Sequence, residues 1–125
     1  MDDQQKLVCI LDDDADIRKA LERVLNLHGY RCRSFSSIAE FNTRANYKEA
    51  ACLILDIHLN GESGIDLKRQ LSHSVPALPV IFMTGRDCSA NREAAKQVGG
   101  AGYLAKPFES KALLGMLEAA IRSPS

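Results

Sequence analysis

The sequence predicts an α/β fold, built as a single, doubly wound, five-stranded parallel sheet with helices on both faces. Short apolar runs alternate five times with segments whose apolar residues recur at helical spacing. The runs 7–11 and 52–55 are continuously apolar, which is typical of strands that are covered on both faces. The chain has 125 residues, of which 46% are hydrophobic, and this is enough for one domain with one substantial core.

The first part of the chain supplies two strands and two helices. Residues 7–11 form the first strand, and a helix follows from residue 15 to about residue 27, where Gly29 stops it. Residues 31–35 alternate between polar and apolar side chains, as in a half-buried strand. Ser37 and Glu40 form a capping box, which starts a second helix that runs to about residue 45.

The second part supplies three more strands and three helices. The strand 52–55 leads through a loop with Gly61 and Gly64 into a helix over 65–72. Residues 80–83 form the fourth strand, and Asp87 or Ser89 is expected to cap the next helix, which runs through residue 98. The short fifth strand covers 101–105, and the last helix extends to about residue 121.

The bulk composition excludes several classes of protein. The 16 basic and 16 acidic residues cancel, so neither nucleic acid nor a membrane surface is an expected partner of this domain. No apolar stretch approaches the ~20 residues of a membrane-spanning helix, and the acidic N-terminus is no signal peptide. A cytoplasmic location is therefore expected. The scattered cysteines lack metal-ligand spacing, which favours reduced thiols over a zinc site; they are Cys9, Cys32, Cys52 and Cys88.

Polar residues of chemical interest follow four of the five predicted strands. They are Asp12 and Asp13, Asp56, Thr84, and Lys106. In an open parallel sheet, ligands bind beyond the carboxyl ends of the strands, so these residues are expected to share one pocket. Carboxylates so close together repel one another unless a cation or protons accompany them. The pocket is therefore a candidate site for a hard divalent metal ion.

The order of these motifs resembles the receiver domain of bacterial two-component response regulators, over about residues 7–121. The similarity rests on residues 10–14 (ILDDD), 53–56 (LILD) with Gly64 downstream, 80–85 (VIFMTG) and 102–108 (GYLAKPF). It implies a flavodoxin-like strand order 2-1-3-4-5 and one receiver domain over 1–125, with its core at about 7–122. The sequences of residues 34–41 and 81–85 resemble the corresponding segments in receivers of the nitrogen-fixation regulator type.

The resemblance implies that Asp56 accepts a phosphoryl group from a sensor histidine kinase or a histidine phosphotransfer protein. Mg²⁺ suits the oxygen ligands and offsets the repulsion between carboxylate and phosphate. Asp13 and Asp56 are the expected direct ligands of Mg²⁺, and Asp12 is expected to act through water. The family pattern implies that the backbone carbonyl of His58 is a further ligand. Lys106 and the Thr84 hydroxyl bind the developing phosphoryl oxygens. Such a domain is a switch with self-phosphotransfer and autodephosphorylation, rather than an enzyme.

The same resemblance implies a conformational switch. Thr84 moves toward the phosphoryl group, Tyr103 turns inward, and the face made by the fourth helix, fifth strand and fifth helix changes for an output domain or partner. A homodimer through that face is possible in such domains, and the Lys106–Pro107 bond is expected to be cis. His58 and Arg86 would border the water path and tune the lifetime of the acyl phosphate.

One departure from the family pattern concerns the loop after Asp56. Receivers usually carry proline four residues after the phosphorylated aspartate, where this chain has Asn60, so a more mobile loop is expected. Two other functions stay open at this point. One is an interaction module of the same fold that does not cycle phosphate. The other, more distant, is a small Mg²⁺-dependent phosphatase acting on free substrates.

Overall fold

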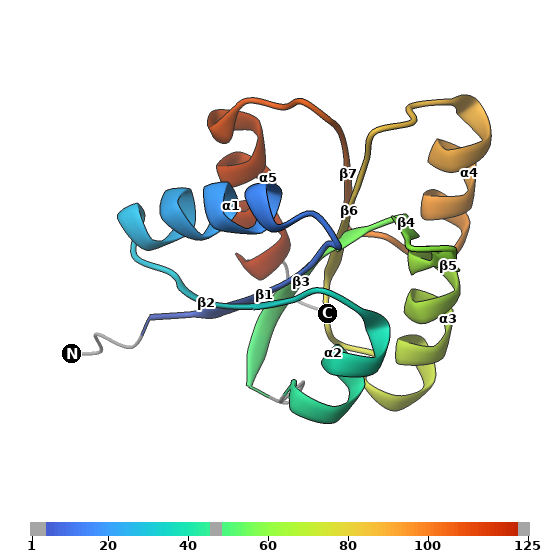
Figure 1. Ribbon diagram of the computed structural model, residues 1–125, viewed down its shortest axis with the longest axis horizontal. Coiled ribbons are helices and arrows are strands. Elements are labelled where there is room, and N and C mark those ends of the chain that lie inside the picture. The colour runs from blue at the N-terminus through green and yellow to red at the C-terminus, as the bar shows by residue number, and fades with distance from the viewer. Residues whose placement is uncertain (1–4, 46–48, 123–125) are drawn as a thin grey trace.

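A five-stranded parallel sheet forms the centre of the computed structural model, which describes residues 5–45 and 49–122 (Figure 1). The strand order β2-β1-β3-β6-β7 confirms the predicted order 2-1-3-4-5, because β4 and β5 form a separate hairpin. The strands of the sheet are β1 (Leu7–Leu11), β2 (Arg31–Phe35), β3 (Ala50–Asp56), β6 (Val80–Thr84) and β7 (Gly102–Ala105).

Helices cover both faces of this sheet, as the sequence predicts. Two lie on one face and three on the other (Figure 1). The first pair is α1 (Ala15–Leu27) and α5 (Ser110–Arg122). The opposite layer consists of α2 (Ile38–Arg44), α3 (Gly64–Ser74) and α4 (Ser89–Gln97). Within the described residues, no helix is long and apolar enough to cross a membrane.

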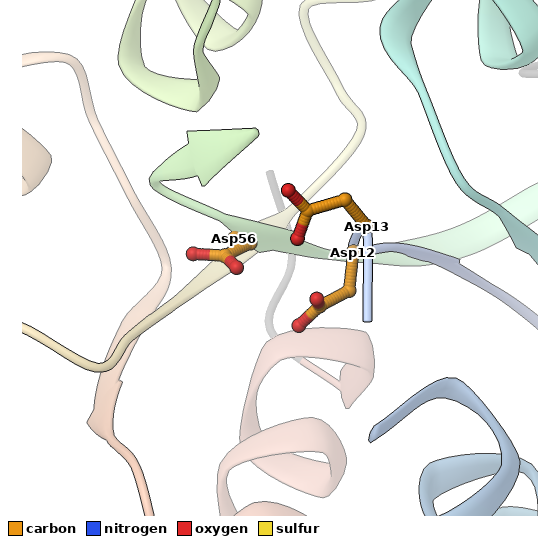
Figure 2. A group of neighbouring side chains, drawn as sticks. All are labelled: Asp12, Asp13 and Asp56. Atoms are coloured by element: carbon orange, nitrogen blue, oxygen red, sulfur yellow. The ribbon is translucent and has the colours of Figure 1, made fainter. Parts of the chain in front are cut away.

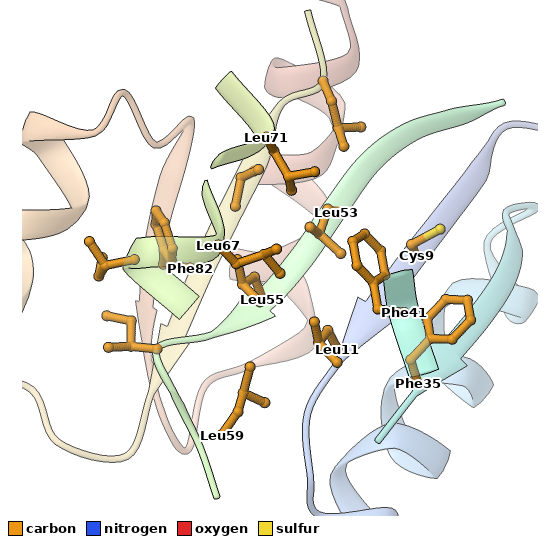
Figure 3. Packing of buried hydrophobic residues seen from close by; sticks show 14 of the residues in the cluster. Cys9, Leu11, Phe35, Phe41, Leu53, Leu55, Leu59, Leu67, Leu71 and Phe82 are labelled. Atoms are coloured by element: carbon orange, nitrogen blue, oxygen red, sulfur yellow. The ribbon is translucent and has the colours of Figure 1, made fainter. Parts of the chain in front are cut away.

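The core is divided by the sheet into two clusters, because successive side chains of a strand point to opposite faces. Cys9 and Leu11 of β1 pack in the α2–α3–α4 layer, which Figure 3 shows, while Val8 and Ile10 pack against α1 and α5. This two-sided burial explains why the central strands are continuously apolar. The rings of Phe35 and Phe41 meet edge to face at 5.5 Å in the α2–α3–α4 layer.

All four cysteines are free thiols. Cys9 and Cys52 are buried, as the apolar runs around them predict, while Cys32 is half-buried and Cys88 is exposed. Burial raises the pKa of Cys9 to about 11 and that of Cys52 to about 12. These two thiols are therefore protonated at neutral pH and act as small apolar core side chains.

The N-cap predicted for α2 is confirmed, and the one predicted for α4 is not. The Ser37 hydroxyl accepts the Glu40 N–H at 3.1 Å, as predicted, and the Glu40 carboxylate returns to the N–H of Ser36 at 2.8 Å. At α4 the expected cap, Asp87 or Ser89, is wrong. Cys88 occupies the N-cap position there and makes no side-chain capping bond. Asp87 is not free to cap, because its carboxylate is bonded elsewhere, as described below.

The segment after β3, expected to be a loop, forms an antiparallel hairpin of β4 (His58–Leu59) and β5 (Glu62–Ser63). Asn60 and Gly61 are its two central residues, with φ of 47° and 85°. Positive φ at both positions is the geometry of a type I′ turn, for which Asn-Gly is strongly preferred. The segment that lacks proline is therefore built as a defined turn and not as an open loop.

Gly64 allows the chain to return closely to the end of β3. A Cβ atom at this position would lie 2.2 Å from the carbonyl oxygen of Asp56, so only glycine fits. The N–H of Gly64 donates to the carbonyl of Ile57 at 2.8 Å. These contacts fix the start of α3 beside Asp56.

Candidate functional site

Three carboxylates converge at the carboxyl edge of the sheet, as the order of the strands predicts. Asp12 and Asp13 follow β1, Asp56 ends the neighbouring β3, and each offers an oxygen within 4.8 Å of the others (Figure 2). Asp12 is fully buried and Asp56 nearly so, whereas Asp13 is half-buried. Buried carboxylates in such proximity need nearby positive charge or hydrogen-bond donors.

Lys106 supplies the positive charge. Its Nζ lies 2.7 Å from Asp12 Oδ2 and 3.0 Å from Asp56 Oδ2, so it bridges the two most buried acids. Burial raises the pKa of Asp12, although the bond to Lys106 acts in the opposite direction. Burial by itself would lower the pKa of Lys106, but its bonds to the two carboxylates outweigh that effect and the pKa is raised. The Lys106–Pro107 bond is cis, as expected.

Each carboxylate also accepts a main-chain N–H. Donor and acceptor pairs are Asp14 to Asp12 Oδ1 at 2.9 Å, Asn60 to Asp13 Oδ2 at 3.0 Å, and His58 to Asp56 Oδ1 at 3.1 Å. These bonds orient the side chains with their remaining oxygen lone pairs available to a ligand.

The donor set fits a hard divalent cation. All three ligand groups are carboxylate oxygens, which Mg²⁺ prefers, and they lie within 4.8 Å of one another, close enough to contact a single ion. A partial coordination shell of this kind leaves positions for water and for a ligand oxygen.

The Thr84 hydroxyl is present at the same edge, but it is turned toward its own loop. Thr84 is fully buried at the end of β6, and its Oγ1 accepts the N–H of Arg86 at 2.9 Å. The main-chain carbonyl of Arg86 in turn accepts a hydrogen bond from the side-chain amide of Asn91, Nδ2, at 2.7 Å. The loop after β6 therefore holds the hydroxyl in this structure.

Tyr103 is half-buried on β7 and is held by a surface ion pair. Its hydroxyl donates to Asp87 Oδ1 at 3.1 Å, and Arg92 binds the two oxygens of the same carboxylate at 2.8 and 2.7 Å. The bond to Arg92 lowers the pKa of Asp87. Burial, followed by the bond to Asp87, raises the pKa of Tyr103. The sequence did not predict this network. Asp87 and Arg92 are five residues apart, close enough in the chain to form an ion pair at the start of α4.

His58 and Arg86 are the remaining predicted site residues. The side chains of His58 and Arg86 are both exposed, and the two residues lie two positions beyond Asp56 and Thr84, whose side chains accept their main-chain N–H groups. Arg18 of α1 was not predicted as a site residue. Its Nη1 donates to the main-chain carbonyl of Asp12 at 2.7 Å and ties α1 to the acidic loop.

Comparison with known proteins decides the family. A family model for the response regulator receiver domain matches residues 8–118. The chain belongs to this family. The domain is thus a signalling module of two-component systems.

Several curated response regulators are similar in sequence to this receiver domain. TodT of Pseudomonas putida is 33% identical over 122 residues, which cover 98% of this chain and 54% of TodT. The DNA-binding transcriptional regulator NtrC of Escherichia coli is 36% identical over 118 residues, covering 94% of this chain and 25% of NtrC. The chain therefore spans about half the length of TodT and a quarter of that of NtrC.

Solved structures support the same fold. A CheY-like receiver domain protein from Methanospirillum hungatei superposes with a TM-score of 0.87 at 22% identity, covering 94% of both chains. A response regulator from Burkholderia pseudomallei gives a TM-score of 0.83 at 27% identity, covering 93% of this chain and 69% of the other. The latter structure contains a phosphorylated aspartic acid, a calcium ion and citrate.

Proposed function

We propose that this receiver domain is a cytoplasmic, phosphorylatable switch, which accepts a phosphoryl group onto Asp56 from a sensor histidine kinase or a histidine phosphotransfer protein. The observation that carries the proposal is the convergence of Asp12, Asp13 and Asp56, with the ammonium group of Lys106 bonded to Asp12 and Asp56. The Burkholderia pseudomallei relative, with its phosphorylated aspartic acid and calcium ion, supports the same chemistry.

Mg²⁺ would be held directly by Asp13 and Asp56, through water by Asp12, and by the backbone carbonyl of His58. When bound, the ion neutralises negative charge shared between carboxylate and phosphoryl oxygens. The hydrogen bonds from the three main-chain amides keep the carboxylates oriented for this role.

Asp56 acts as the nucleophile. A carboxylate oxygen of Asp56 forms a bond to phosphorus while the bond between phosphorus and the histidine nitrogen of the donor breaks, and the imidazole leaves with that electron pair. Lys106 can exchange its bond to Asp56 for one to a phosphoryl oxygen while it keeps its bond to Asp12. Thr84 would donate its hydroxyl to another phosphoryl oxygen.

The signal then leaves the site through Thr84 and Tyr103. For its hydroxyl to reach the phosphoryl group, Thr84 must give up its present bond to the N–H of Arg86. That change moves the β6–α4 loop, which carries Asp87, the partner of Tyr103. The face formed by α4, β7 and α5 is thereby altered for an output domain, a partner or a second copy of the domain. The exposed His58 and Arg86 would tune access of water to the acyl phosphate.

Labelling with radioactive acetyl phosphate and Mg²⁺ tests this function. Wild-type protein should acquire label that a chelator prevents, Asp56→Asn should acquire none, and Asp16→Asn, which alters an exposed acid of α1, should label normally. Full labelling of Asp56→Asn would contradict the proposal. Absence of both label and Mg²⁺ binding in wild type would favour a phosphorylation-independent module. Turnover of a generic phosphate ester without a stable labelled protein would indicate a phosphatase.

A further inference from the structure

Of the three main-chain hydrogen bonds to the carboxylates of the site, one joins parts of the chain that are far apart. The main-chain N–H groups that donate to the carboxylates of Asp12 and Asp56 lie two residues beyond their acceptors. The N–H that donates to Asp13 belongs to Asn60, 47 residues away. The first two bonds are local turns that follow from the adjacent chain. The bond from Asn60 instead crosses from the β4–β5 hairpin to the loop after β1.

The hairpin holds the Asn60 amide in place from both sides. His58 pairs with Ser63, and Leu59 pairs with Glu62, so only Asn60 and Gly61 form the turn. The Leu59 side chain is 1% exposed and packs in the core cluster under α3. A turn anchored in this way presents its first amide in a fixed direction, and asparagine tolerates the required positive φ of 47° better than most residues.

Asp13 needs such a partner more than the other two acids do. Lys106 bonds Asp12 and Asp56, and neither of its two ion pairs includes Asp13. Repulsion from the neighbouring carboxylates favours rotation of the half-buried Asp13 side chain out toward solvent. The Asn60 N–H, 3.0 Å from Asp13 Oδ2, opposes that rotation.

We propose that Asn60 is a positioning residue for the metal site: its main-chain N–H, aimed by the Asn-Gly turn, holds the Asp13 carboxylate toward Asp56 before any ion binds. The inference rests on the metal site of the proposed function and adds a specific structural element to it. Partners that orient metal ligands typically change metal affinity by 10–100-fold when they are lost.

Calorimetric titration with Mg²⁺ tests the role with three variants. Asn60→Gly keeps the N–H and takes positive φ freely, so its affinity should stay within about twofold of wild type. Asn60→Pro has no N–H and cannot adopt positive φ, so its affinity should fall about tenfold. Gly61→Ala strains the same turn but keeps the Asn60 N–H, and it should lose clearly less affinity than Asn60→Pro. Equal affinity of Asn60→Pro and wild type would overturn the inference, as would an equal loss in Gly61→Ala.

Amide hydrogen exchange of the metal-free protein gives a second readout. The Asn60 amide should exchange slowly in wild type and at least several-fold faster in Asp13→Ala, while the Glu62 amide in the same hairpin stays unchanged. Unchanged exchange of the Asn60 amide in Asp13→Ala would overturn the inference. Absence of Mg²⁺ binding by wild type would instead overturn the metal site and with it the proposed function, so the two failures are distinguishable.

Discussion

At the scale of single residues, Gly64 shows how tightly the backbone is packed beside Asp56. A methyl group there would lie 2.2 Å from the Asp56 carbonyl oxygen, and backbone atoms cannot move aside as a flexible side chain can. We expect Gly64→Ala to lower the free energy of unfolding by about 2 kcal/mol, measured by urea denaturation.

Gly115 provides the matched control for that substitution. It lies on α5, where an added Cβ meets nothing within 4 Å, so Gly115→Ala should stabilise the helix by about 0.5–1 kcal/mol. A Gly64→Ala variant as stable as wild type would contradict the close packing described for the end of β3.

Lys68 gives a pH-dependent prediction away from the site. This residue of α3 is 7% exposed, its Nζ donates to the Ser72 hydroxyl at 2.7 Å, and burial lowers its pKa. A lysine whose folded-state pKa is lowered favours folding at pH above the unfolded value of 10.5, and that contribution is lost as pH falls through the folded value. At pH 7 the charged group therefore costs stability.

We expect Lys68→Met to raise the melting temperature at pH 7, because it keeps the apolar stem and removes the charge. The difference from wild type should shrink as the pH approaches 10.5, since the wild-type lysine then becomes neutral. Differential scanning calorimetry at pH 7 and at about pH 10 measures both. A constant difference at the two pH values would show that the charge is not responsible.

The residues of the site differ in how far the sequence predicts them. Asp12, Asp13, Asp56 and Lys106 could be placed together, because each follows a parallel strand and those ends meet at one edge. The bond between the Thr84 hydroxyl and the Arg86 N–H could not be predicted, because it depends on the path of an irregular loop. The interaction of Tyr103 with Asp87 depends on that same loop.

At the scale of elements, α4 begins without a side-chain cap. Cys88 has the extended N-cap conformation, with φ of −149° and ψ of 163°, but a thiol is a weak acceptor. We expect Cys88→Ser to raise the free energy of unfolding by about 0.5–1 kcal/mol, because the hydroxyl can accept an orphan N–H of the first turn.

The existing cap of α2 is the reference for this substitution. Ser37→Ala removes the bond to the Glu40 N–H and should cost about 1 kcal/mol in the same denaturation experiment. A loss of stability in Cys88→Ser would show that α4 does not begin where the structure places it.

The contact between the β6–α4 loop and β7 gives a further element-scale prediction. Because the Asp87 carboxylate contributes to the raised pKa of Tyr103, Asp87→Asn should bring the phenol pKa closer to its ordinary value. Titration of ¹³C-labelled tyrosine by NMR measures the change. The pKa of Tyr30, raised by its own burial and by Glu118, should not move. An unaltered Tyr103 pKa in Asp87→Asn would mean that the carboxylate does not hold the ring in solution.

The β4–β5 hairpin is the element that the sequence reasoning did not predict. Its strands have two residues each, which is too short for an alternating pattern to be recognised. The Asn60-Gly61 dipeptide is nevertheless a strong hairpin signal, and it could have predicted a turn at this position. The helices and longer strands were predicted more closely, because each carries a full period of its pattern.

At the scale of the whole molecule, the strand order explains why one site exists. β1 and β3 are neighbours at the centre of the sheet, so the acids that follow or end them are adjacent without any special loop. β7 lies at one edge, and the residue that follows it, Lys106, reaches back across β6 to bond both Asp12 and Asp56. The fold thus brings a cation between acids that lie 44 residues apart in the sequence, at positions 12 and 56.

Peptide-level mass spectrometry after exposure to acetyl phosphate, with and without a chelator, tests the proposed switch most directly. One phosphoryl group on the peptide that contains Asp56, present with Mg²⁺ and absent with the chelator, is the expected result. A phosphoryl group on another residue, or modification of Asp56 that is unaffected by the chelator, would contradict it.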